Sequence, residues 1–230
     1  MKLRCILVAA AVAAFLAFVC LGRAQNPGAP VDAAALHQQS LDAVKKKDFK
    51  AAVEAAEKAT KADPTKAEYF SQLGIAISQR MNEVNFMQMA VMSGRLKKAF
   101  EKSVELDPNH VAGLIGLSRF YTNAPEIAGG SVEKAREYAN RVLKLAPLQG
   151  EIELGHIATK AEEYPEALKH YEAALALKPD NAGLHHAAAR TLAKLGRKED
   201  ARAQFEAALK LEPDFDAAKK ALAELDKPAP

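Results

Sequence analysis

Histidines are the side chains of this sequence with the most scope for binding a metal ion. His156, His185 and His186 fall in neighbouring helical segments, and His170 lies between them along the chain. A zinc site requires three or four converging ligands, often including a carboxylate, and the helical spacing of these residues does not supply such a set. We therefore predict no metal site and interpret the four histidines as solvated or hydrogen-bonded side chains.

Methionines form a second cluster with chemical potential. Four of the five methionines are Met81, Met87, Met89 and Met92. Thioethers bind copper(I), which an exported protein can encounter. However, Phe86, Met89 and Leu96 continue one face of a long helical pattern, and methionine commonly fills irregular packing. We interpret these methionines as core filler, with an apolar patch that faces a partner as the alternative.

Signatures of catalysis are absent from the sequence. It contains no phosphate-binding glycine loop, no Gly-x-Ser-x-Gly elbow and no His-Glu-x-x-His zinc helix. Gly129, Gly130 and Ser131 precede a helical segment and could bind an anion through backbone amides. We favour a simpler interpretation, in which the glycines form a turn and Ser131 caps the helix. The sequence therefore predicts a protein that is not an enzyme and needs no cofactor.

The first 24 residues have the pattern of a secretory signal peptide. Lys2 and Arg4 precede an uncharged apolar run over 6–21, and Gly22 and Ala24 are the small residues of a cleavage site. The apolar run is shorter than the ~20 residues that span a membrane. We predict an exported protein, periplasmic in a bacterium, with secretion or anchoring by an uncleaved signal as alternatives. After cleavage the chain would have no membrane span.

Removal of residues 1–24 changes the charge and the cysteine content. The segment holds three basic residues and no acid, which leaves 32 − 3 = 29 basic residues against 29 acidic ones. Such a balance argues against general affinity for nucleic acid. Cys5 and Cys20 also lie in this segment, so the exported chain would contain no thiol and no disulfide. Packing alone must hold the fold together.

The elements that position the remaining side chains are revealed by a repeat. "ALALKPDN" at 174–181 returns as "ALKLEPDF" at 208–215, so that Pro179 and Pro213 are 34 residues apart. Similar phrases end at Pro64, Pro108 and Pro147. Each proline follows an apolar helical pattern and is expected to end it, because proline cannot donate the next backbone hydrogen bond. A period near 34 residues predicts an array of stacked helix pairs.

Small residues recur at fixed distances before these prolines. The fifth repeat holds Ala189, Ala201 and Ala208, and the fourth holds Gly155, Ala167 and Ala174 at the same distances. Phe205 and Tyr171 occupy one further shared position. Small residues let antiparallel helices approach closely, and the aromatic fills the space toward the next pair. This pattern resembles the tetratricopeptide repeat family over residues 33–215.

The resemblance implies an all-α fold, a right-handed α-solenoid of antiparallel helix pairs. After the signal peptide (1–24) we expect the segments to be a flexible entry at 25–32, repeats at 33–66, 67–110, 111–147, 148–181 and 182–215, and a capping helix and tail at 216–230. The second repeat has an enlarged, Met-rich second helix, and the third has a Gly-Gly turn.

The family also implies where a partner would bind. The first helices of successive repeats line a concave groove, and none of the fifteen positions expected to face it here is acidic. In the last three repeats these positions include Arg119, Asn123, Ile152, His156, Lys160, His186, Arg190 and Lys194. Such a groove favours an acidic segment or a C-terminal carboxylate. The alternative is a solvated basic face without a ligand.

The sequence thus favours a scaffold in the cell envelope that binds an extended, acidic segment of a protein or peptide partner. The alternative function is a small-molecule or lipid-binding protein with an apolar pocket near the insertion of the second repeat. No feature of the sequence indicates an oligomeric state.

Overall fold

The computed structural model describes residues 32–225, which are entirely α-helical apart from turns and two short 3-10 helices. No strand occurs in this range, and the predicted all-α solenoid is confirmed. The predicted signal peptide (1–24), the entry up to residue 31 and the tail from residue 226 lie outside the described residues. No helix within 32–225 combines the length and the apolarity that crossing a membrane would require.

Ten helices form five antiparallel pairs, and an eleventh follows them. The pairs are α2 (Ala33–Lys45) with α3 (Phe49–Ala62), α4 (Ala67–Arg80) with α5 (Phe86–Leu106), α6 (Val111–Asn123) with α7 (Val132–Leu145), α8 (Pro147–Lys160) with α9 (Tyr164–Leu177), and α10 (Ala182–Lys194) with α11 (Lys198–Leu211). The single helix is α12 (Asp216–Leu225), and the 3-10 helices are η1 (Met81–Glu83) and η2 (Glu126–Ala128).

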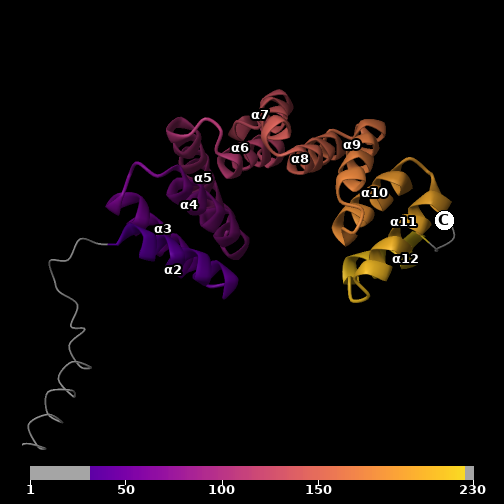
Figure 1. Ribbon diagram of the computed structural model, residues 1–230, viewed down its shortest axis with the longest axis horizontal. Helices are drawn as coiled ribbons and strands as arrows, with labels where there is room; N and C mark the ends of the chain where they lie inside the picture. The colour runs from indigo at the N-terminus through magenta and orange to yellow at the C-terminus, as the bar shows by residue number, and fades with distance from the viewer. Residues whose placement is uncertain (1–31, 226–230) are drawn as a thin grey trace, which may run out of the picture. The chain divides into compact units, whose positions relative to one another are not determined.

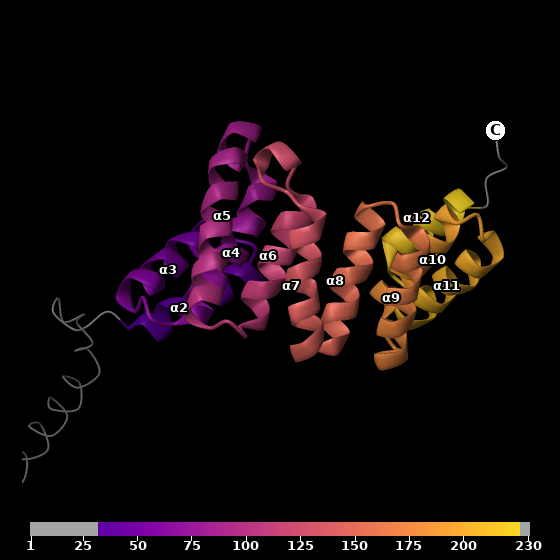
Figure 2. The same ribbon diagram turned by 90° about the horizontal axis from the view of Figure 1, so that it is seen from above.

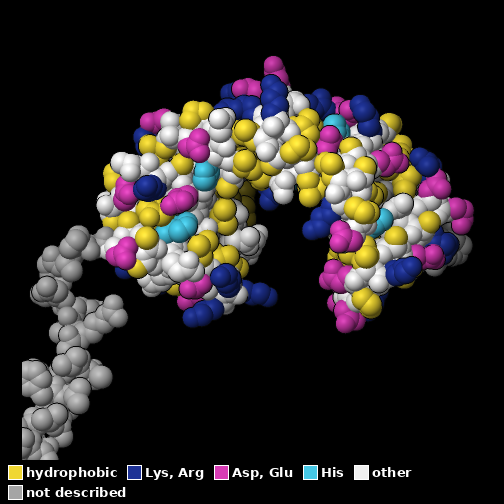
Figure 3. Space-filling model, in the orientation of Figure 1, with side chains coloured by type: hydrophobic (Ala, Val, Ile, Leu, Met, Phe, Trp, Pro, Cys, Tyr) yellow, Lys and Arg dark blue, Asp and Glu magenta, His cyan; other side chains and the backbone are white. Residues whose placement is uncertain are grey.

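The pairs stack in chain order, as Figure 1 shows. The second helix of each pair packs against the first helix of the next pair, and α12 covers α11 at the end of the array. First helices also pack against one another, α2 with α4, α4 with α6 and α6 with α8, whereas second helices within residues 33–225 make no comparable contact. First helices therefore form the inner face of the array, which is hollowed in Figure 3.

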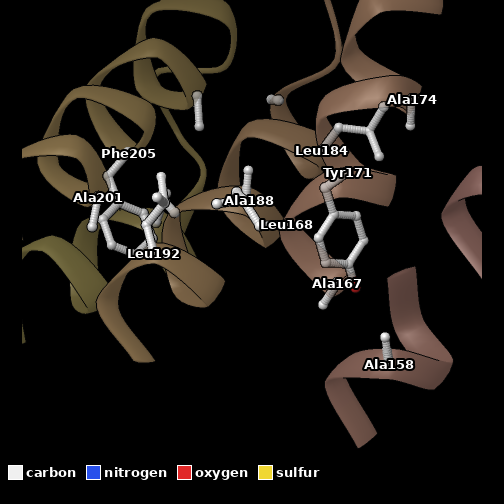
Figure 4. Close-up of a cluster of buried hydrophobic side chains, with 14 residues drawn as sticks. Ala158, Ala167, Leu168, Tyr171, Ala174, Leu184, Ala188, Leu192, Ala201 and Phe205 are labelled. Atoms are coloured by element: carbon white, nitrogen blue, oxygen red, sulfur yellow. The ribbon is translucent and has the colours of Figure 1, made fainter. Parts of the chain in front are cut away.

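Glycine and alanine allow this close stacking. The ring of Phe100 on α5 lies between Gly74 of α4 and Gly116 of α6, where an added Cβ would come within 2.6 Å and 2.4 Å of the ring. Gly155 of α8 makes the same room for Tyr171 of α9. In the core of the last two pairs, large side chains alternate with alanines (Figure 4).

Helix ends confirm one sequence prediction and correct another. Ser131 is the N-cap of α7, since its hydroxyl accepts a hydrogen bond from the Lys134 amide at 3.2 Å, and Gly129 adopts φ 89° in the preceding turn. Pro147 was expected to end the third repeat. It is instead the first residue of α8, because proline lacks only an amide that a first helical turn leaves unpaired in any case.

The second pair departs most from the others. Its second helix, α5, has 21 residues, and Asn85 caps it by accepting from the Gln88 amide at 3.0 Å. The prediction that the methionines fill the core is right for Met81 and Met92, which pack against the core around Phe100. It is wrong for Met87 and Met89, because the extra turns extend α5 beyond the helices that could cover them.

Candidate binding cleft between helices α8 and α10

The inner face opens between α8 and α10. These two first helices lack the side-by-side packing that joins the earlier ones, and two adjoining cavities of about 490 Å³ and 310 Å³ lie between them. His156, Tyr171 and Ala187 line both cavities. We call the two cavities together the inner cleft. Because α9 packs against both α8 and α10, it closes the cleft from behind.

Tyr171 of α9 forms the floor of the inner cleft. Its side chain is buried, and its hydroxyl lies 3.2 Å from the Thr159 hydroxyl. Thr159 donates its own proton to the Gly155 carbonyl at 2.8 Å, so the tyrosine hydroxyl must be the donor to Thr159. Burial raises the pKa of Tyr171, which keeps the phenol neutral. The floor is therefore an uncharged aromatic ring held at both its edge and its tip.

A buried ion pair lies at one end of the inner cleft. Glu153 of α8 is only 2% exposed. Arg119 of α6 donates to it through Nε, at 2.9 Å from Oε1 and 3.1 Å from Oε2, and through Nη2, at 2.5 Å from Oε1. The guanidinium thus neutralises the one carboxylate that lines the larger cavity. Arg119, predicted as a groove cation, is engaged by an acid from the next repeat.

The other end carries cations without partners. Arg190 and Lys194 of α10 line the smaller cavity, which no acidic residue lines. Lys160 lies at the end of α8, close enough to His156 for its charge to lower the pKa of that imidazole. All three side chains are exposed, and none forms a hydrogen bond or ion pair with another residue of 32–225. Figure 3 shows Lys and Arg side chains beside the hollow near α10.

Two histidines of the inner cleft are held neutral. Burial lowers the pKa of His156, and the charges of Arg119 and Lys160 lower it further against the opposing effect of Glu153. Burial and the charge of Arg190 likewise lower the pKa of His186. The His186 ring lies 5.0 Å from the Phe215 ring, between centroids. The cleft therefore offers neutral imidazoles beside fixed positive charges.

The remaining histidines of the fourth and fifth repeats lie outside the cleft, where they are hydrogen-bonded as expected. His170 Nδ1 lies 2.7 Å from Glu151 Oε2, and His185 Nδ1 lies 2.7 Å from Gln204 Oε1. Within residues 32–225, no group of three histidine or acidic side chains is arranged to hold a metal ion.

Six of the eight predicted groove residues line the inner cleft, namely Arg119, Ile152, His156, His186, Arg190 and Lys194. Asn123 instead donates its amide to the Arg119 carbonyl at 2.8 Å, and Lys160 lies at the margin. Sequence reasoning did not assign Tyr171, Thr159 or Glu153 to the site. Tyr171 carried a signal, since an aromatic recurs at its position, but that signal also indicates ordinary packing between pairs.

A different cavity, of about 580 Å³, lies between α3 and the first turns of α5. Its apolar lining comes from Val53, Val84, Met87, Val91 and Met92. Ion pairs bound it, Arg80 with Glu83 and Arg95 with Glu57. We call this cavity the α3–α5 cleft. It lies next to the insertion of the second repeat, where the sequence alternative placed an apolar pocket.

Comparison with known proteins agrees with the fold. Tetratricopeptide repeat models match residues 33–66 and 158–225. TTC0263, a thermophilic TPR protein of Thermus thermophilus, superposes with a TM-score of 0.70 at 19% identity, over 84% of this chain and 98% of its own. No curated protein matches the chain.

Two further solved structures share the architecture. YrrB, described as a TPR protein with an unusual peptide-binding site, has a TM-score of 0.53 at 18% identity, over 83% of this chain and 91% of its own. MamA of Desulfovibrio magneticus RS-1 has a TM-score of 0.59 at 18% identity, over 82% and 99%.

The class defined by the helix pairs and their inner face is an α-solenoid with an extended surface along its first helices. More specifically, the chain is a tetratricopeptide repeat protein.

Proposed function

We propose that the chain is a non-catalytic scaffold that binds an extended, acidic segment of a partner protein in the inner cleft. The observation that carries this proposal is the set of three unpaired cations, Lys160, Arg190 and Lys194, beside a cavity with an uncharged floor. Because no acid lines that cavity, the balancing charge must come from solvent ions or from a ligand.

The chemistry of the cleft favours a carboxylate. Arginine and lysine donate charge-assisted hydrogen bonds to carboxylates, and a guanidinium can hold both oxygens at once. Tyr171 and Ile152 supply apolar surface for neighbouring residues of the same segment. Extended peptides bind in this manner through a few anchors that fix position and a charge match that fixes orientation. The peptide-binding site named for YrrB supports a peptide as the ligand class.

Export to the cell envelope is the location that we propose. The pattern of residues 1–24 supports it, as does the absence of cysteine after residue 24, since a thiol-free chain is insensitive to an oxidising compartment. We propose no nucleic-acid partner, because the chain after residue 24 carries equal numbers of basic and acidic residues.

A peptide library tests the ligand class. Random peptides with free C-terminal carboxylates are selected on the immobilised full chain, and the same library is selected with amidated C-termini. We expect enrichment of aspartate and glutamate in the recovered sequences, and loss of the terminal-acid subset in the amidated library. Recovery of neutral or basic sequences with equal efficiency would contradict an acidic ligand.

A second function is favoured by the α3–α5 cleft, whose lining is mainly apolar and whose volume of about 580 Å³ suits a small apolar ligand. Native mass spectrometry of the purified chain distinguishes the two functions. A retained small molecule or lipid that is lost in Val53→Glu would support this pocket, whereas a bare mass would favour the scaffold.

A further inference from the structure

Two lengthened turns of the array carry apolar side chains that no part of residues 32–225 covers. At the start of α5, Phe86 is 81% exposed, Met87 80% and Val91 68%. In the turn between α6 and α7, Ile127 is 99% exposed. Leaving one such side chain in water is common, but leaving several in adjacent repeats marks an interaction site.

The distribution of exposed apolar residues separates this cluster from ordinary surface. Large hydrophobic side chains exposed elsewhere in 32–225 are Leu145, Leu177 and Leu211, each alone at the end of a second helix. The others gather in the second and third pairs: Phe86, Met87, Met89, Val91, Ile127 and Val132. We call these six residues the apolar edge.

The fold places the apolar edge on one side of the array. Every pair is antiparallel, so the turns that join its two helices all lie at the same edge, and the connections between pairs lie at the opposite one. The start of α5 and the turn with η2 therefore project in the same direction from neighbouring pairs. Figure 2 shows the end of α5 beside the α6–α7 turn at one edge.

The shape of the apolar edge distinguishes it from a docking groove. With 3.6 residues per turn, Phe86, Met87, Met89 and Val91 occupy more than half of the circumference of the helix end. The surface is thus two convex tips, the helix end and Ile127, and not a flat or concave face. A folded protein partner covers one face of a helix, whereas an apolar fluid surrounds a projecting tip on all sides.

Charge leads to the same medium. No charged residue lies between 84 and 94, and the flanking Arg80 and Arg95 are already paired with Glu83 and Glu57. The tips therefore enter an apolar phase without bringing unpaired charge into it. Outside the described residues, the uncharged apolar run at 6–21 is the kind of segment that brings a chain to a membrane.

We propose that the apolar edge inserts into the acyl layer of a lipid bilayer and so orients the array on a membrane surface. The attraction comes from apolar area removed from water, because the nearby charges are paired. Binding should therefore occur on zwitterionic vesicles and be insensitive to salt. This proposal does not depend on the inner cleft, which lies in the fourth and fifth pairs.

The chain contains no tryptophan, so an introduced one is a unique fluorescent reporter. The variants Phe86→Trp and Ile127→Trp place it on the apolar edge of the full chain. Leu177→Trp is the matched control, because Leu177 is exposed at the opposite edge. With phosphatidylcholine vesicles we expect a blue shift and quenching by brominated acyl chains for the first two variants only, unchanged at high salt.

Each other outcome overturns the proposal. Equal quenching of all three reporters would mean that the chain adsorbs through another segment, such as residues 6–21. Quenching only on anionic vesicles, reversed by salt, would mean electrostatic adsorption. A blue shift without vesicles that grows with protein concentration, together with a dimer in light scattering, would assign the apolar edge to a second copy of the chain. The absence of any shift at Phe86→Trp would leave the edge unoccupied by lipid.

A second set of variants isolates the contribution of the edge. Adding Met87→Ser, Val91→Ser and Ile127→Ser to the Phe86→Trp chain should lower the acyl-chain quenching at least about tenfold, because apolar area drives insertion. Adding Leu145→Ser, Leu177→Ser and Leu211→Ser should leave it unchanged. All substituted side chains are exposed, so helicity by circular dichroism should be equal in both sets. Unchanged quenching in the first set would contradict insertion.

Discussion

Arg119 of α6 covers the carboxylate of Glu153 on α8, so that the acid of one repeat is neutralised by the base of the preceding one. The glutamate is 2% exposed, whereas the arginine side chain is 59% exposed. The pair therefore joins the third and fourth helix pairs at the point where the inner cleft begins, and it removes both charges from those available to a ligand.

Breaking this pair from the arginine side should cost stability. Arg119→Ala leaves a buried carboxylate without its partner, and we expect a loss of about 1–3 kcal/mol, limited by water that reaches the exposed position. Glu153→Gln should cost less, because a neutral amide tolerates burial better than an unpaired carboxylate does. Urea unfolding of both variants and of the double variant measures the coupling. Additive effects would contradict a direct interaction.

The lowered pKa values of His156 and His186 predict a pH dependence of stability. Both imidazoles have a pKa below the unfolded value of about 6.5, so the unfolded chain binds more protons between the two values. Their contribution is fully present above pH 6.5 and is lost as the pH falls through the folded pKa. The free energy of unfolding of wild type should fall over this window, relative to His156→Gln with His186→Gln. Parallel curves for the two proteins would contradict the assignment.

Two glycine substitutions should have opposite signs. In Gly116→Ala the new Cβ would lie within 2.4 Å of the Phe100 ring, which cannot move away because Gly74 faces its other side. We expect a destabilisation of about 1–3 kcal/mol from overpacking. Gly94→Ala, in the exposed part of α5, meets no atom within 4 Å and should stabilise by up to about 1 kcal/mol through helix propensity. Thermal unfolding compares them, and equal shifts would refute the packing model.

Glu162, in the turn between α8 and α9, adopts φ 60°, a left-handed conformation that is strained for a side chain. The corresponding turn between α10 and α11 uses Gly196 at φ 76°. Glu162→Gly should therefore stabilise by about 0.5–1 kcal/mol, since the relief of strain exceeds the entropy of a more flexible unfolded chain. A lower melting temperature for this variant would contradict the argument.

The repeat made most of the fold predictable. Small residues at fixed distances from proline specify helix pairs that approach closely, and Gly155 faces Tyr171 as that pattern requires. Pro147 was misassigned because a proline that follows one helix can equally begin the next. Exposure of Met87 could not be predicted either, since helical periodicity shows which face a residue shares but not where the neighbouring helices end.

The site was only partly predictable for a related reason. Positions along the first helices identified Arg190 and Lys194, because helical spacing alone decides which residues share a face. Pairing between repeats is a property of the stacked array. Glu153 lies 34 residues after Arg119, and only the packing of α6 on α8 reveals that it engages this cation while Lys160 stays free.

The central claim is that Lys160, Arg190 and Lys194 hold an acidic segment, and charge reversal tests it most directly. A peptide selected on the wild-type chain is titrated against Lys160→Glu with Arg190→Glu and Lys194→Glu. The control is Lys58→Glu with Lys61→Glu and Lys178→Glu, which changes the same net charge at positions outside the cleft. With helicity unchanged, we predict that the cleft variant loses affinity at least about a hundredfold, since each charge-assisted hydrogen bond contributes about 1.5–3 kcal/mol, while the control binds as wild type does. Equal affinity for the cleft variant and the control would contradict the account.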